Sequence, residues 1–362
     1  MLKIHAFRYR YVILATTVAA FSLDLSADPD QNARKTDVLP ISARVKRLFT
    51  ETKTICVGRF LIDVPQKSEV VYGPTSLPWP IIAYPGKGNS IDKIVAERLS
   101  ELAEEKDWAI GPLADEDSSV GKIVNGAVPN QKIIFGVSKE SGGIYRIDSY
   151  IKVDSDLFIQ KANPISSRKD ETVRELNAIA ASLRSRDELE VPTQPGVCIE
   201  AGFVSDPNIA GYEALNIGVR LAEFPDVHLA VSVTKKDVLV ESDALEPRLR
   251  QAEEIASRSG NAAWYSHIKT LRRGGRVIGK WHGFEILAWK PAQAEEGESH
   301  EFVFVSQGEP KNSLLPVLEV EFHTGIKENR LGGTKPSVSD DEAVAIWDKL
   351  TASIRVRPTD GQ

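Results

Sequence analysis

Cysteine is scarce in this sequence, because Cys56 and Cys198 are the only two among 362 residues. Two cysteines placed so far apart exclude a zinc cluster built from closely spaced thiolates. The six histidines never pair at a spacing of three or four residues, and the metalloprotease motif His-Glu-x-x-His is absent. The hydrolase pentapeptide Gly-x-Ser-x-Gly is missing as well. No stretch of the chain therefore announces a chemical reaction, and we expect no metal and no cofactor.

The chain also lacks an excess of positive charge. Its formal net charge is −6 and its pI is about 5.7, which argues against a nucleic-acid partner. Hydrophobic residues make up 42% and charged residues 27%, values that belong to a folded soluble protein. The length fits two domains of ordinary size.

The first 27 residues are typical of a secretory signal peptide. Lys3, Arg8 and Arg10 precede the apolar run Tyr11–Leu23, and Ala27 is a candidate cleavage site. The run is too short for a membrane span, which needs about 20 residues. An uncleaved N-terminal anchor is the alternative. We expect an exported protein with no stable membrane span after cleavage.

For an exported protein, the number of cysteines indicates whether a disulfide forms. An even number of cysteines in an oxidising compartment favours a disulfide, here between Cys56 and Cys198. The alternative is two separate buried thiols, each acting as a small apolar core residue.

The chain divides into segments of different composition. Residues 28–49 are polar and read as a tether, with a helical turn at 42–49. We expect an N-terminal lobe at 50–187, a charged and proline-rich linker at 188–195, and a C-terminal lobe at 196–358. The expected fold class is α+β, with two similar lobes that are each a twisted antiparallel sheet with helices packed on one face.

Hydrophobic periodicity predicts the elements of each lobe. In the first lobe it predicts helices at 91–106 and 170–184, and strands at 54–64, 68–72, 79–84, 122–128, 131–138, 144–153 and 157–162. In the second lobe it predicts helices at 247–259 and 340–352, and strands at 197–204, 213–222, 227–234, 268–271, 276–280, 284–289, 301–306 and 317–322.

The two lobes look like repeats of one plan. Each opens with a cysteine in an apolar, β-prone stretch that is followed by Asp and Pro. Each closes with a similar helix, since Ser182–Arg186 aligns with Ser353–Arg357 at an offset of 171 residues. We therefore predict a structural duplication.

Several residue groups are candidates for function. Ser90 and Lys93 fit the Ser-x-x-Lys pattern and would be nucleophile and base in an exported envelope enzyme. Ser90 is also expected to cap the helix at 91–106. A basic group around Gly274-Gly275 reads as the exposed side of a hairpin or as a patch for an acidic partner: Lys269, Arg272, Arg273, Arg276 and Lys280.

Other charged and aromatic residues have two interpretations each. Acidic pairs, such as Glu104-Glu105, are expected on solvated faces. Four aromatic residues fit either an interface or a core: Trp79, Trp264, Tyr265 and Trp281. Arg59 and Asp63 are expected to fix the end of a strand.

The opening stretch Thr54–Pro65, TICVGRFLIDVP, resembles a motif of the two-domain, Tli4-like immunity proteins that neutralise phospholipase effectors of type VI secretion systems. The stretch Gly196–Phe203, GVCIEAGF, resembles the opening of their second domain. The similarity extends from about residue 50 to residue 357.

This resemblance implies a periplasmic binding protein with no enzymatic activity. Its partner would be a cognate lipase effector, gripped between the two lobes. The motifs are structural, so they transfer no contact residues. Two alternatives stay open, namely the envelope enzyme with Ser90 and Lys93, and a periplasmic small-ligand binder that uses the cleft between the lobes.

Overall fold

The computed structural model describes residues 42–205, 211–258, 262–294 and 296–360. The expected signal peptide at 1–27 and the tether residues 28–41 lie outside these ranges. Within them, no helix has the length and apolar character required to cross a membrane.

The described residues of the first half of the chain form three α-helices and ten strands, linked by short 3₁₀ turns. In order, these helices and strands are α1 (Ala43–Leu48), β1 (Thr52–Val57), β2 (Phe60–Pro65), β3 (Glu69–Tyr72), β4 (Thr75–Ser76), β5 (Pro80–Tyr84), α2 (Ile91–Lys106), β6 (Ile123–Asn125), β7 (Gln131–Ser138), β8 (Ser141–Val153), β9 (Asp156–Ala162), α3 (Lys169–Ser182) and β10 (Leu183–Ser185).

The second half follows a similar order. Its described elements are β11 (Gly196–Ile199), β12 (Gly202–Ser205), β13 (Glu213–Arg220), β14 (His228–Lys235), α4 (Leu245–Arg258), α5 (Ala262–Tyr265), β15 (Lys269–Ile278), β16 (Trp281–Lys290), β17 (Ser299–Ser306), β18 (Val317–His323), α6 (Asp340–Ala352) and β19 (Arg355–Val356).

One large antiparallel sheet runs through both lobes. Its strand order is β15-β16-β17-β18-β14-β13-β4-β5-β9-β8-β7-β6, with β3 also paired to β13. Outward from the centre of the sheet, the strand order β14-β18-β17-β16-β15 of one lobe corresponds to the order β5-β9-β8-β7-β6 of the other. The two lobes meet at β13 and β4 and extend from there in opposite directions. The predicted duplication is therefore present in the topology.

A second, smaller layer covers the middle of this sheet. It consists of two three-stranded sheets with orders β1-β2-β19 and β10-β12-β11. Each small sheet combines the opening hairpin of one lobe with the closing strand of the other lobe. Its apolar side chains share one core with the large sheet; Ile55, Phe60, Val197 and Leu215 are all buried there.

The helices lie on both faces of the large sheet. Leu176 of α3 and Trp347 of α6 pack on the face that carries the small layer. Val95 of α2 and Leu249 of α4 pack on the opposite face. The expected class of two α+β lobes with antiparallel sheets is confirmed, but the helices of each lobe, expected on one face of the sheet, lie on both faces. The lobe boundaries at 187 and 196 stay a prediction, because the sheets cross between the lobes.

Two predictions about strands were wrong in the same way. The apolar stretches 54–64 and 197–204 were each expected to be one strand, but each is a hairpin. The first turns at Gly58, which has a positive φ of 60°, and the second turns at Ala201, with φ of 52°. In each hairpin the strands next to the turn are buried, and only two residues separate them, so the sequence pattern shows little break at the turn.

The C-terminal end of α3 also differs from the prediction. The helix was expected to reach residue 184, but it ends at Ser182, and Leu183 to Ser185 form β10. Leu183 is extended because it pairs with Val204 of β12. The strand is therefore imposed by a hairpin that follows it in sequence.

Candidate functional site

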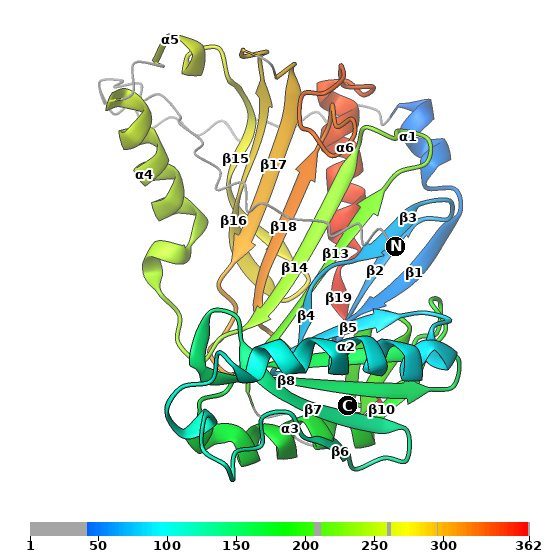
Figure 1. The fold of residues 1–362 in the computed structure, drawn as a ribbon. Coiled ribbons are helices and arrows are strands. Elements are labelled where there is room, and N and C mark those ends of the chain that lie inside the picture. The colour runs from blue at the N-terminus through cyan, green and yellow to red at the C-terminus, as the bar shows by residue number, and fades with distance from the viewer. Residues whose placement is uncertain (1–41, 206–210, 259–261, 295, 361–362) are drawn as a thin grey trace.

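The face of the large sheet that carries α2 and α4 is open in its centre. α4 packs on β16 and β17, and α2 packs on β7 and β8. In the described part of the chain these two helices leave the outward side chains of β13, β14 and β18 uncovered between them. Figure 1 shows α4 beside the β15–β17 end of the sheet and α2 across the β7–β8 end. We call the uncovered part the open face.

Strand alternation decides which side chains form the open face. In β13, β14 and β18 every second residue is buried in the core, and its neighbours are half-buried on the other side. The half-buried residues of the open face are small or polar: Ala214, Asn216, Gly218 and Arg220 on β13; His228, Ala230, Ser232 and Thr234 on β14; Val317, Glu319, Glu321 and His323 on β18. These side chains are unsuited to a hydrophobic core and suited to a surface on which another protein docks.

Strand register arranges the charges of the open face in a row across the sheet. His323 lies opposite His228, which lies opposite Arg220, which lies opposite Glu69 of β3. Arg220 donates to His228 over 3.2 Å and contacts Glu69 over 3.2 Å. The neighbouring row places Gly218 and Ala230 side by side, so neither position adds a long side chain to the open face.

Two groups on the open face have shifted pKa values. Burial lowers the pKa of His228, and the nearby Arg220 charge lowers it further. Burial by itself would raise the pKa of Glu321, but the hydrogen bond from His323 and the charges of His323 and Arg248 together outweigh it, and the pKa is lowered. At neutral pH the open face therefore presents a neutral His228 next to charged Arg220 and Glu321.

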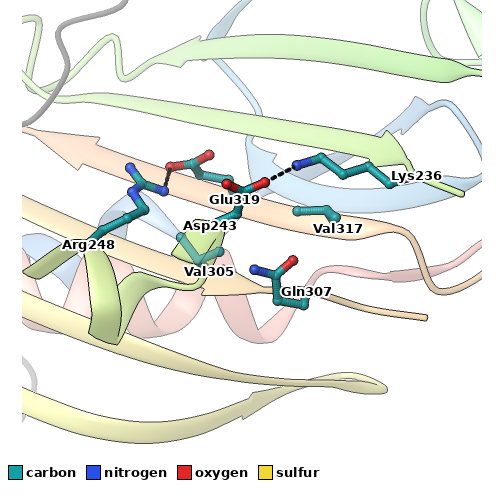
Figure 2. A pocket seen from close by; sticks show the side chains of 7 residues that line it. All are labelled: Lys236, Asp243, Arg248, Val305, Gln307, Val317 and Glu319. Carbon is teal, nitrogen blue, oxygen red and sulfur yellow. Dashed lines mark hydrogen bonds and ion pairs between the residues drawn. The ribbon is translucent and has the colours of Figure 1, made fainter. Parts of the chain in front are cut away.

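A shallow hollow of about 220 Å³ lies where the open face meets the start of α4. Figure 2 shows its two ion pairs, Lys236 with Asp243 over 2.9 Å and Arg248 with Glu319 over 3.0 Å. Val305, Gln307 and Val317 complete the lining. The Gln307 side-chain amide donates to the main-chain oxygen of Val240 over 3.2 Å, and its side-chain oxygen has no hydrogen-bond partner among the described residues.

The structure forms a disulfide between Cys56 and Cys198, which are 142 residues apart. Both side chains are fully buried. Arg59 and Asp63, expected to fix a strand end, each bind the second lobe. Arg59 forms a buried ion pair with Glu213 at 2.8 Å, and Asp63 pairs with Arg355 at 2.9 Å.

Ser90 and Lys93 are not arranged as a nucleophile and its base. Lys93 is 76% exposed at its side chain and pairs with Glu97 at 4.0 Å. Ser90 ends a 3₁₀ turn, and its side chain makes no capping hydrogen bond to α2, contrary to the expected role. In the described residues, no group of three or more His, Cys, Asp or Glu is placed to hold a metal ion.

The basic group around Gly274-Gly275 lies on the β15–β16 hairpin, as expected, but the two glycines are not at its turn. Both glycines lie inside the continuous strand β15, and the chain turns at Gly279, where φ is 55°. Arg272 and Arg276 bind Glu285 and Asp348 within the fold. Their charges are therefore neutralised by neighbours and do not form a patch for an acidic partner.

The expectation that acidic pairs lie on solvated faces is wrong for Glu105. Its side chain is buried beneath α2 and binds Arg98 at 2.7 Å. Among the aromatics, Trp281 is a core residue, whereas Trp264 is half-buried and donates to Ala292 O. Trp79 is half-buried as well and donates to Glu175 over 2.7 Å.

The open face was not found from the sequence. Its signal was available in the alternation Glu319-Val320-Glu321-Phe322, in which one side of a strand is apolar and the other is charged. Which strands would be left without a helix depends on packing between distant segments, and no local pattern encodes it.

Comparison with known proteins assigns the chain to a family. Two family models match: Tle cognate immunity protein 4 N-terminal domain at residues 53–188, and Tle cognate immunity protein 4 C-terminal domain at residues 190–359. The chain therefore belongs to the Tle cognate immunity protein 4 family, as the opening motifs predicted. A search of curated proteins finds no match.

Solved structures share the fold. A structure described as the Tle4-Tli4 complex contains a chain with a TM-score of 0.69 and 22% identity, and the match covers 85% of this chain and 98% of that one. The immunity protein TplEi of the type VI secretion system of Pseudomonas aeruginosa matches with a TM-score of 0.65 and 23% identity, over 85% of this chain and 98% of TplEi. TplEi bound to an "L" peptide gives the same TM-score and identity, over 86% and 99% of the two chains.

Proposed function

We propose that this protein binds a cognate phospholipase effector of a type VI secretion system and inhibits it, which protects the producing cell from its own toxin. Membership in the immunity family supports the proposal. So does the similar chain in the Tle4-Tli4 complex. The observation that carries it in this chain is the open face, a polar surface bordered by α2 and α4 and left free by the described helices.

Inhibition proceeds by occupancy and not by catalysis. The effector docks on the open face, and the lipase is held away from lipid. One immunity protein then blocks one effector, so titration against a fixed amount of lipase reaches full inhibition at an equimolar ratio. Inhibition at a small fraction of that ratio would indicate that the chain acts as an enzyme on the effector.

The working compartment of this proposal is the periplasm. The first 27 residues have the composition of a secretory signal. The Cys56–Cys198 disulfide suits an oxidising compartment. Fractionation of cells that express the full chain tests the location, and recovery from the cytoplasm would contradict it.

The binding test uses the lipase encoded beside this chain. The two purified proteins are mixed, and both complex formation and lipase activity on phospholipid vesicles are measured. We expect a stable complex and loss of activity. A lipase that neither binds nor loses activity would refute the assignment of this partner.

A matched pair of variants locates the docking surface. Ala230→Arg places a long side chain in the middle of the open face, beside Gly218. Ala181→Arg makes the same change at an exposed position of α3, on the other face of the sheet. We expect Ala230→Arg to weaken binding by about tenfold or more and Ala181→Arg to leave it unchanged. Equal binding by both variants would show that the effector docks elsewhere.

A further inference from the structure

The two lobes are interleaved by a reciprocal exchange of hairpins. The hairpin β1–β2 opens the first lobe but pairs with β19 at the end of the second. The hairpin β11–β12 opens the second lobe but pairs with β10 at the end of the first. Neither lobe therefore contains its own opening hairpin, and the lobes cannot move apart unless both hairpins leave their sites.

Side chains secure the exchanged hairpins. Asp63 of β2 accepts from both guanidinium nitrogens of Arg355, over 2.9 and 3.0 Å. The hairpin β11–β12 is held in the same manner by Arg186, which donates to Gly202 O over 3.2 Å and to Ile199 O over 3.0 Å. Each closing strand thus contributes an arginine, directly or just beyond its end, that binds the hairpin from the other lobe.

The segment between the lobes is braced and does not have the structure of a hinge. Arg186 donates to the main-chain oxygens of Asp187, Glu188 and Glu190, over 3.0 to 3.1 Å. Arg357, its counterpart at the offset of 171, donates to Gln194 O over 2.8 Å and to Gly196 O over 2.7 Å. Both arginines are buried, with 4% and 2% exposure. The predicted linker is therefore fixed along its length.

The seam between the two small sheets is short. Gly58 and Cys198 exchange two main-chain hydrogen bonds of 2.8 Å each. The Cys56–Cys198 disulfide crosses the same seam. In the large sheet, the lobes also meet where β13 pairs with β3 and β4. The disulfide is thus the covalent part of a junction that otherwise rests on few hydrogen bonds in this layer.

We propose that the exchanged hairpins, latched by the Cys56–Cys198 disulfide, hold the two lobes at one fixed angle, so that the protein receives its effector as a preformed rigid body. α2 and α4 border the open face from opposite lobes, so the angle between the lobes sets the width of the docking surface. The statement about binding rests on the proposed function, whereas the statement about rigidity concerns the free protein. Preorganisation of this kind avoids the cost of ordering the lobes on binding.

The test measures the distance between the lobes. Dyes are attached through unnatural amino acids at Glu104 of α2 and Glu254 of α4, both of which are exposed. We expect the oxidised protein to give one narrow distribution of transfer efficiency, unchanged when the lipase encoded beside this chain is added. In Cys56→Ala/Cys198→Ala, and in the wild type unfolded, reduced with dithiothreitol and refolded in its presence because the disulfide is buried in the folded protein, we expect a broader distribution and affinity for that lipase about tenfold weaker.

The control variant is Leu176→Ala, which removes a buried side chain within the first lobe. It is expected to lower stability while the narrow distribution remains. A broad distribution in the oxidised free protein, or a shift on effector binding, would overturn the proposal. So would a distribution in the reduced protein as narrow as in the oxidised one. The measurement on the free protein stands even if the lipase does not bind, so failure of the partner assignment is recognised separately.

Discussion

Arg98 fastens α2 to the sheet through buried charges, at a place where a helix usually relies on apolar contacts. It donates to Glu105 over 2.7 and 2.8 Å and to Asp148 over 2.6 Å. Burial would by itself raise the pKa of Glu105, but the hydrogen bonds and charge of Arg98, with the Val137 N–H and the Arg146 charge, together outweigh it, and the pKa is lowered. Gly136 leaves room for this cluster, because a Cβ there would lie 2.1 Å from the Glu105 carboxylate.

Removing the Arg98 guanidinium should lower the free energy of unfolding. Arg98→Met leaves two buried carboxylates with less neutralising charge, and we expect a loss of about 3–5 kcal/mol in the free energy of unfolding. Urea denaturation measures it. Lys93→Met, at an exposed position of the same helix, should change stability by no more than about 0.5 kcal/mol. A loss below 1 kcal/mol for Arg98→Met would show that the cluster contributes little to stability.

His300 makes the stability of the fold depend on pH. It is buried between Thr324 and Asp340, with hydrogen bonds of 2.8 and 2.9 Å. Burial lowers its pKa below the ordinary 6.5, although Asp340 works against the shift. Because the unfolded chain then binds the proton more readily, the free energy of unfolding falls as the pH drops below 6.5.

We therefore expect the melting temperature to fall between pH 7 and pH 5 in the wild type, and to fall less steeply in His300→Gln. Asp340 has a lowered pKa, so its contribution is lost only at more acidic pH, below its ordinary 3.8. His267→Gln, at an exposed site, is the control and should keep the wild-type slope. An unchanged slope in His300→Gln would contradict the assignment.

At the scale of elements, the helices were predicted well and the hairpins were not. The ranges 91–106 and 340–352 match α2 and α6, because regular apolar spacing and clear ends mark both helices. The Ser339–Glu342 capping box at the start of α6 is a local signal of this kind. Gly58 was overlooked as a turn because apolar residues continue on both sides of the two-residue turn Gly58-Arg59. The strands expected at 268–271 and 276–280 are one strand, because Gly274-Gly275 does not interrupt β15.

Gly58 and Gly275 should respond differently to substitution by alanine. Gly58 has φ of 60°, and a Cβ there would lie 3.3 Å from Leu215. Gly58→Ala should therefore destabilise the protein by about 1–2 kcal/mol. Gly275 has an ordinary φ and free space, so Gly275→Ala should be neutral or stabilising by up to about 1 kcal/mol. Thermal unfolding compares the two, and equal effects would contradict the proposed role of the turn at Gly58.

At the scale of the whole molecule, the composition and the opening motifs were sufficient to predict the family and the α+β class. The duplicated ending was visible at an offset of 171 residues, and α3 and α6 begin at Lys169 and Asp340, which differ by the same number. The exchange of hairpins was not predictable, since it depends on which lobe receives each hairpin. The open face was missed for the same reason, because it is defined by where helices of distant segments do not pack.

Hairpin exchange predicts that the lobes do not fold alone. Residues 50–187 expressed by themselves would lack the partner strand β19, and residues 196–358 would lack β10. We expect each fragment to be unfolded or aggregated, and the two fragments coexpressed to associate into a complex with the circular dichroism spectrum of the intact chain. Differential tagging and affinity purification test this association. A well-folded monomeric fragment would show that the exchange is dispensable.

The position of β1 and β2 has a further consequence for how the nascent chain matures. Asp63 and its partner Arg355 are separated by 292 residues, so the first hairpin to be synthesised finds its site only when the last helix and strand have emerged. Contacts of such long sequence separation slow folding. The apolar hairpin must therefore remain unaggregated throughout synthesis, and a chaperone that holds exposed β-prone segments would reduce aggregation of the unfinished chain.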